Sequence, residues 1–197
     1  MGFKEEVFDR SAYRLQSTVP QDVLSAPGYR VRGTQNDDEL AYPSVRLVGL
    51  RTLREISVFY DHAQKRLAWV LAERHRPFLG PRHLVADGSG AVVGYIRPRY
   101  LSLRRTWEAL DPQGIVLWKV QAEHGLIVSR MPSSYGFAFL LGDVVAGRIK
   151  GESNFFDHTT RMTLDLTGDP RKAVDRRLAL AAAFLIDSTL PRYQGTA

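Results

Sequence analysis

Short runs of apolar residues, several of them alternating with polar residues, follow one another from about residue 44 to residue 166. The runs are rich in β-branched and aromatic residues, and Gly, Pro, Asp and Asn separate them, as is typical of strands and turns. In LSLRRTWEAL, for example, Leu101, Leu103 and Trp107 recur among polar neighbours. Such alternation is expected of a sheet that buries one face and exposes the other. The pattern predicts a mainly β, antiparallel structure.

Three of these runs share a weak internal repeat. In each, a strand ends at an Asp, a tight turn follows and an apolar strand leaves, and the three residues are Asp61, Asp87 and Asp111. LLGDVVAGRIKGE, residues 140–152, is a looser fourth copy. Asp and Gly form such turns, and the flanking alternation forms a hairpin. Successive hairpins must protect their outer edges, and closure into a barrel does so.

A different pattern begins after residue 168. Residues 178–186 are apolar without interruption, and they rise about 13.5 Å as a helix, too little to cross a bilayer core of about 30 Å. Asp169 is a suitable N-cap, Pro170 suits the first helical position, and Pro191 marks the end. We therefore expect a helix over about residues 171–189, buried on all sides inside the sheet. The expected core comprises Val58, Trp69, Val92, Ile96, Trp107, Val116, Trp118, Phe139, Leu180, Phe184 and Ile186.

The first 43 residues have a different residue pattern, because they combine a short amphipathic segment with several turn-forming stretches. We predict a partly ordered N-terminal arm over residues 1–43 and a single barrel domain over residues 44–197.

Hairpins that turn at Asp, followed by a C-terminal hydrophobic helix, resemble the tubby-like superfamily, and most closely its phospholipid scramblase and LURP-one-related branch. The resemblance spans about residues 45–192. Its most specific element is DRRLALAAAFLIDSTL, an apolar run that closes on Asp187, and the hairpins Asp87–Gly90–Ile96 and Asp111–Gly114–Val120 recur less specifically. It implies a closed antiparallel barrel of about twelve strands with the C-terminal helix through its centre.

The chain also departs from the scramblase pattern. It has no Cys for palmitoylation and no comparable Pro-rich arm. The segment before the helix offers Asp165, Asp169 and Asp175, but it lacks the alternating carboxylates and closing Glu of a calcium loop. The resemblance therefore implies neither calcium binding nor lipid transport here.

The chain has a net charge of +6, and its basic residues are mostly Arg, with 22 Arg against 5 Lys. A GC-rich genome accounts for this bias without functional meaning, whereas a basic surface that meets anionic lipid or nucleic acid accounts for it functionally. The N-terminus has no secretory h-region, and no apolar run reaches the roughly 18 residues of a membrane span. We expect a cytoplasmic protein, either free or peripheral at the inner membrane face.

Two basic clusters are the candidate sites for an anionic ligand or lipid headgroups. The first cluster lies in IRPRYLSLRRTW, residues 96–107, where arginines are interleaved with Tyr100 and Trp107. Cations together with aromatic side chains suit a headgroup surface or single-stranded nucleic acid. Arg104 and Arg105 cannot both face solvent on a regular strand, so we expect a bulge or turn there. Solvated surface positions would explain the same residues without a ligand. The two clusters are Arg97, Arg99, Arg104 and Arg105, and, at the helix entry, Arg171, Lys172, Arg176 and Arg177.

No catalytic group of residues is apparent. GSGAVVG, residues 88–94, has the wrong spacing for a dinucleotide loop and joins two strands. No His pair has the spacing of helical metal ligands, Ser133 and Ser134 lack a nucleophile elbow, and Asp157 and His158 are adjacent on one segment. We therefore predict no enzyme activity, no cofactor and no metal.

Together these observations favour a non-enzymatic, scramblase-like or LURP-one-like barrel that binds anionic phospholipid or a phosphorylated ligand at the membrane surface. The alternative is a protein-interaction or structural scaffold with no lipid role, whose partner binds the N-terminal arm or the barrel rim. Nucleic-acid binding is less favoured because no recognised motif is present.

Overall fold

We analysed a computed structural model of the chain. It describes residues 8–18, 28–34, 39–47, 55–60, 66–76, 80–99, 102, 104–123, 134–153, 160–169 and 171–189.

Antiparallel strands make up most of the described chain, and one helix follows them. The elements are β1 (Ala12–Thr18), β2 (Gly28–Gly33), β3 (Glu39–Leu47), β4 (Glu55–Tyr60), β5 (Arg66–Arg76), β6 (Gly80–Asp87), β7 (Val92–Arg99), β8 (Thr106–Leu110), β9 (Val116–Ala122), β10 (Ser134–Leu141), β11 (Val144–Ser153), β12 (Thr160–Asp165) and α2 (Arg176–Thr189). The predicted mainly β, antiparallel architecture with a C-terminal helix is confirmed.

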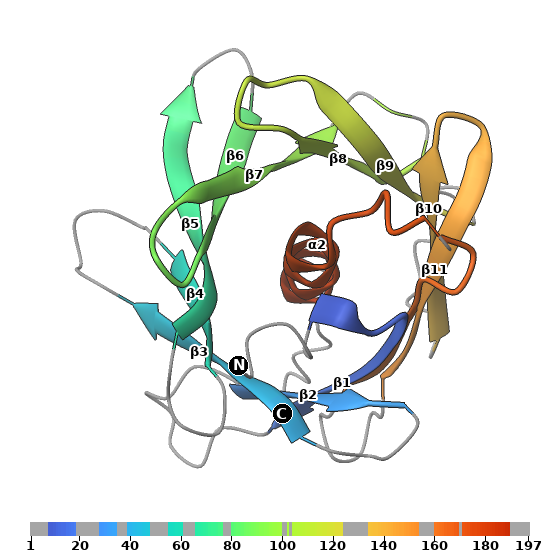
Figure 1. The fold of residues 1–197 in the computed structure, drawn as a ribbon, viewed down its shortest axis with the longest axis horizontal. Coiled ribbons are helices and arrows are strands. Elements are labelled where there is room, and N and C mark those ends of the chain that lie inside the picture. The colour runs from blue at the N-terminus through green and yellow to red at the C-terminus, as the bar shows by residue number, and fades with distance from the viewer. Residues whose placement is uncertain are drawn as a thin grey trace, which may run out of the picture.

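The strands pair in chain order, each with the one before it and the one after it. In addition, β1 pairs with β12, so that Arg14 lies opposite Thr163 on one side and opposite Arg32 of β2 on the other. This strand order is that of a closed barrel, and Figure 1 shows the strands surrounding α2.

The apolar helix fills the middle of this arrangement. Every residue from Leu178 to Ile186 is at most 3% exposed, and α2 contacts β6, β7 and β8. The approach is close at Gly94 of β7, where an added Cβ would lie 3.4 Å from Cδ1 of Leu178. Around the helix, the inward faces of the strands supply large side chains such as Trp118 and Phe139, whose ring centroids are 5.2 Å apart.

Alternation along the strands decides which side chains enter the core. In β12, Met162 and Leu164 are buried, whereas Arg161, Thr163 and Asp165 are exposed. The same period of two explains why a strand with one apolar face belongs to the barrel wall.

The Asp-turn repeat has a common geometry at Asp87 and Asp111, the two closely matching copies that the structure describes. The backbone N–H groups of Gly90 and Gly114 each donate to the carbonyl of the Asp three residues earlier, at 3.0 Å. Both glycines have a φ of 92°, a left-handed conformation that favours Gly. The carboxylates of Asp87 and Asp111 accept hydrogen bonds from the N–H groups of Ala91 and Ile115. Asp61, the first member of the repeat, lies outside the described residues.

The predicted N-terminal arm is corrected by the structure. Residues 12–47 contain β1, β2 and β3, and these strands are part of the sheet. The turn-forming stretches between them separate strands of one sheet, so no boundary falls between residues 43 and 44.

The predicted start of the helix is also wrong. The helix begins at Arg176 and not near residue 171, because the Asp169 carboxylate accepts hydrogen bonds from the N–H groups of Ala173 and Val174. Lys172 has a φ of 51°, which is incompatible with a right-handed helix. Asp175 is the true N-cap, since its side chain accepts a hydrogen bond from the N–H of Arg177 at 2.9 Å.

Seven of the expected core residues are buried, and two are not. Val92 and Val116 are each 40% exposed because they begin β7 and β9 at the barrel end. The side chains of Val58 and Trp69 lie outside the described residues. The buried members are Ile96, Trp107, Trp118, Phe139, Leu180, Phe184 and Ile186.

Candidate anion-binding surface

The first predicted basic cluster is built around a carboxylate. Arg97 and Arg99 of β7 both pair with Glu108 of β8, at 2.6 Å and 3.4 Å. The Glu108 side chain is only 4% exposed, so the two cations neutralise a buried acid on the outer side of the barrel wall. Much of their charge is thus already compensated within the protein.

Arg104 and Arg105 lie in the connection between β7 and β8, and both are exposed. The strand begins only at Thr106, whose hydroxyl donates to the carbonyl of Arg104 at 2.9 Å. The expected interruption before β8 is confirmed. Neither guanidinium forms an ion pair with the described part of the chain.

The second predicted cluster surrounds the entry to α2, and its members differ sharply. Arg176 is buried and donates to Asp169 at 2.8 Å and to the carbonyl of Val174 at 2.7 Å. Burial alone would raise the pKa of Asp169, but backbone hydrogen bonds and the Arg176 guanidinium lower that pKa overall. This geometry gives Arg176 a role inside the fold.

The other three cations of this cluster are nearer the surface. Lys172 pairs with Asp9, and Arg177 pairs with Asp175 at 2.5 Å. The hydrogen bonds that Arg177 donates to the Asp175 carboxylate raise the pKa of Arg177, against the effect of partial burial. Arg171 is exposed and has no ion pair among the residues described.

A third basic surface, which the sequence reasoning missed, lies on the outer face of β1, β11 and β12. A groove of about 590 Å³ runs along it. Four cations and two carboxylates are among the residues that line this basic groove, which are Arg14, Val145, Gly147, Arg148, Lys150, Glu152, Arg161, Thr163, Asp165, Thr167 and Gly168.

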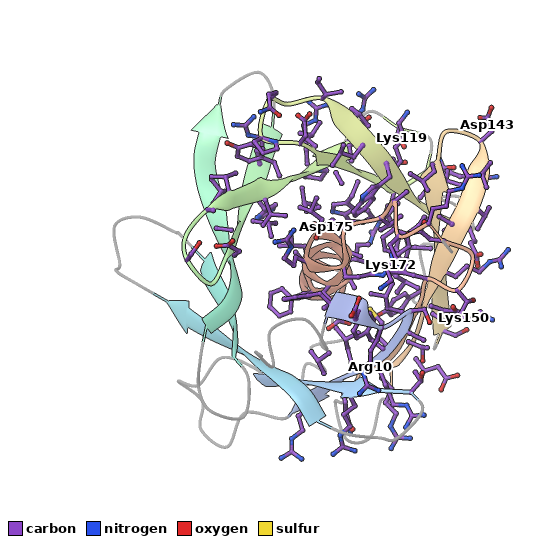
Figure 2. All side chains as sticks on the ribbon, in the orientation of Figure 1. Arg10, Lys119, Asp143, Lys150, Lys172 and Asp175 are labelled. Carbon is purple, nitrogen blue, oxygen red and sulfur yellow. The ribbon has the colours of Figure 1, made fainter. Side chains whose placement is uncertain are left out.

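The strand register arranges part of this surface as a row without any acid. Arg32, Arg14, Thr163 and Lys150 lie opposite one another across β2, β1, β12 and β11. Like charges placed directly opposite each other destabilise a sheet. The row therefore concentrates positive charge around the hydroxyl of Thr163. Figure 2 shows Lys150 on the outer side of β11.

The neighbouring rows are balanced differently. Arg148 lies opposite Asp165 but pairs instead with Glu123, at 2.9 Å. The Asp165 carboxylate turns toward its own strand end, where it accepts hydrogen bonds from the N–H and hydroxyl of Thr167. The side chains of Arg161 and Lys150 are exposed, and neither side chain makes a hydrogen bond or ion pair to another described residue. Glu152, the other carboxylate of the groove, lies opposite Arg161 in the strand register but forms no ion pair with it.

Individual strands carry too little charge to reveal this surface. The run RIKGE places Arg148 and Lys150 on one face of β11, and alternation could have assigned both to the solvent side. The other cations come from β1 and β12, which lie more than 140 residues apart in the chain and meet only through the β1–β12 pairing.

Other chemistry is sparse in the described chain. No helix there is long and apolar enough to cross a membrane, and no group of three acidic or His side chains there could hold a metal ion. His83 is a titratable side chain away from these basic surfaces. It lies opposite the buried Ile96, and burial lowers the pKa of its imidazole. Ser133, Asp157 and His158 lie outside the described residues.

The basic groove lies on β1, β11 and β12, whereas the two predicted clusters lie on β7, in the β7–β8 connection and in the segment that enters α2. Comparison with known proteins adds no identity: no family model matches the chain, and no curated protein matches it significantly.

Proposed function

We propose that this protein is a non-enzymatic barrel of the tubby-like type that docks on anionic phospholipid at a membrane surface. The observation that carries the proposal is the basic groove, and above all the row of Arg32, Arg14, Thr163 and Lys150. Phosphate groups are the natural partners of such a row, because Arg and Lys bind them through charge-assisted hydrogen bonds.

The spacing of the row suits a phosphate group. Neighbouring strands lie about 4.8 Å apart, so Arg14 and Lys150 are separated by roughly 10 Å, with Thr163 between them. A phosphate above Thr163 would accept a hydrogen bond from its hydroxyl and would lie within reach of both long cationic side chains. The headgroup site would then be formed by β1, β12 and β11.

Support for the tubby-like assignment comes from architecture and not from sequence matches. The sequence resemblance implied about twelve antiparallel strands and a central C-terminal helix, and the strand order and the buried α2 fit that expectation. Architecture alone does not carry function from one protein to another, so the lipid role rests on the groove.

Vesicle co-sedimentation tests the proposal. Phosphatidylcholine vesicles with and without 30% phosphatidylserine, roughly the charge of a cytoplasmic leaflet, are compared at low and high salt. We expect binding to the acidic vesicles only, weakened by salt because the interaction is electrostatic. The variant R14Q/K150Q should lose most of this binding.

The predicted clusters supply a matched control. R104Q/R105Q removes the same charge from exposed positions on the other side of the barrel. Equal losses in both variants would point to net charge alone, whereas a loss confined to R104Q/R105Q would move the site to the β7–β8 connection. No binding by the unaltered protein would overturn the lipid role.

The second candidate is a protein-interaction scaffold. It is favoured by exposed apolar side chains at one barrel end, among which Ile115 and Val144 are each 65% exposed. A scaffold predicts no vesicle binding under any of these conditions and a self-association or partner complex that depends on the apolar residues.

A further inference from the structure

Large apolar side chains are exposed at one end of the barrel. Monomeric proteins rarely expose contiguous apolar patches without a binding role. Within the described chain these side chains are 40–65% exposed. We call them the apolar rim: Val92, Ile115, Val116, Leu117, Val144 and Val145.

The rim residues belong to three hairpins that turn at the same barrel end. Consecutive antiparallel strands place the turns after β6, β8 and β10 together. Between the last two hairpins the register is explicit, because Leu140 of β10 lies opposite Lys119 of β9 and opposite Val145 of β11. Leu117 and Val144 lie within two residues of that row, so the two hairpins present one surface.

The apolar rim is continuous with the basic groove. Val145 belongs to the rim and also lines the groove, where Arg148 follows it on the same strand. A single surface therefore carries apolar side chains at the barrel end and cations along the adjoining wall. An anionic bilayer has the complementary order, with phosphates directly outside its apolar region.

Two of the acidic residues at this end have their carboxylates engaged in their own turns. Asp87 and Asp111 direct their carboxylates into their own turns, where Asp111 accepts a hydrogen bond from the N–H of Ile115 at 2.7 Å. Asp143, at the tip of the β10–β11 hairpin (Figure 2), stays exposed beside Val144. Unlike Asp87 and Asp111, it accepts no hydrogen bond from the backbone of its own turn among the described residues, so an anionic surface would meet its full charge.

We infer that the protein meets the membrane with its hairpin end, so that the apolar rim enters the bilayer interface while the basic groove contacts the headgroups. This inference rests on the proposed function and adds an orientation to it. Affinity then depends on two separable contributions: apolar burial at the rim, which salt does not screen, and charge in the groove, which salt screens.

The absence of native Cys makes the orientation directly measurable. I115C and V144C each introduce one thiol at the rim, and S134C introduces one at the exposed opposite end of β10. Each is labelled with an environment-sensitive fluorophore and mixed with the phosphatidylserine-containing vesicles. We expect a blue shift, and quenching by brominated lipid, at positions 115 and 144 but not at 134. Vesicle binding with no shift at the rim, or with the same shift at position 134, would overturn the inference.

Affinity provides the second readout. I115S/V144S should weaken binding to acidic vesicles roughly fivefold or more, since two exposed side chains lose their apolar burial. The salt dependence should stay as in the unaltered protein. Q113S, on the same turn as Ile115, is the matched control and should bind normally. D143N should bind more tightly, because it removes a negative charge beside the rim.

These outcomes separate the two proposals. If the unaltered protein does not bind vesicles, the proposed function fails and the orientation with it. If it binds and R14Q/K150Q weakens it while I115S/V144S has no effect, only the orientation is wrong. Self-association that I115S/V144S abolishes, without vesicle binding, would instead assign the rim to a second copy of the chain.

Discussion

The Nη1 atom of Arg176 lies 2.8 Å from Oδ2 of Asp169, and both side chains are at most 4% exposed. This pair fastens the segment after β12 to the first turn of α2. The Asp169 carboxylate is further held by the N–H groups of Ala173 and Val174, and the Arg176 guanidinium by the carbonyl of Val174. The cation closest to the helix start therefore serves the insertion of the helix into the barrel.

Replacing one partner should be costly. Arg176→Met leaves the Asp169 carboxylate buried without its cation, and we expect the free energy of unfolding to fall by about 3–5 kcal/mol. Urea denaturation at neutral pH measures it. Arg171→Met removes an exposed cation nearby and should change stability by less than about 0.5 kcal/mol. Equal effects of the two substitutions would contradict the structural role of Arg176.

The burial of α2 predicts a graded loss of stability. Leu180 is 2% exposed, so Leu180→Ala should cost about 2–5 kcal/mol through lost packing and a cavity. Leu180→Asp buries an unpaired charge and should abolish folding. Thermal and urea unfolding measure both. Val144→Ala, at a position that is 65% exposed, is the control and should leave the melting temperature almost unchanged.

Gly94 is predicted to tolerate no side chain. A Cβ there would lie 2.2 Å from the carbonyl oxygen of Leu110, on the backbone of the neighbouring strand. Gly94→Ala should therefore push β7 and β8 apart and cost about 1–3 kcal/mol or more. Gly90→Ala is the comparison, because it meets no atom within 4 Å and only strains a positive φ, at about 1 kcal/mol. A Gly90 variant less stable than the Gly94 variant would contradict the close strand contact.

Local patterns made much of this fold predictable. The apolar run at 178–186 can only be buried, and the turns at Asp87 and Asp111 need nothing beyond Asp, Gly and their flanking strands. These features depend on residues a few positions apart. Sequence reasoning found them for that reason.

Features that depend on distant pairing were not predictable in the same way. β1 belongs to the barrel because Tyr13 lies opposite Leu164 and Leu15 opposite Met162, and no local signal reveals that contact. The helix start shifted because Asp169 binds Ala173 and Val174 before the helix begins. The basic groove combines single cations from separate strands, so its charge appears only once the register is known.

His83 predicts a pH dependence of stability. It lies opposite Ile96 on the inward face of the barrel wall, and burial lowers its pKa below the ordinary 6.5. The folded state therefore binds fewer protons at this position than the unfolded state does, and acid favours unfolding. Stability from the neutral imidazole should be complete above about pH 7. It should be lost progressively as the pH falls through 6.5 toward the folded-state pKa.

The comparison variant is His83→Gln, which keeps a neutral polar side chain at all pH values. Urea unfolding of both proteins between pH 5 and pH 8 should give a difference in unfolding free energy that shrinks as the pH falls, because only the unaltered protein loses the imidazole contribution. The other four His residues are the same in both proteins, so their contributions cancel in the difference. A difference that stays constant across the range would show that His83 is solvated, and would place its side chain outside the barrel interior.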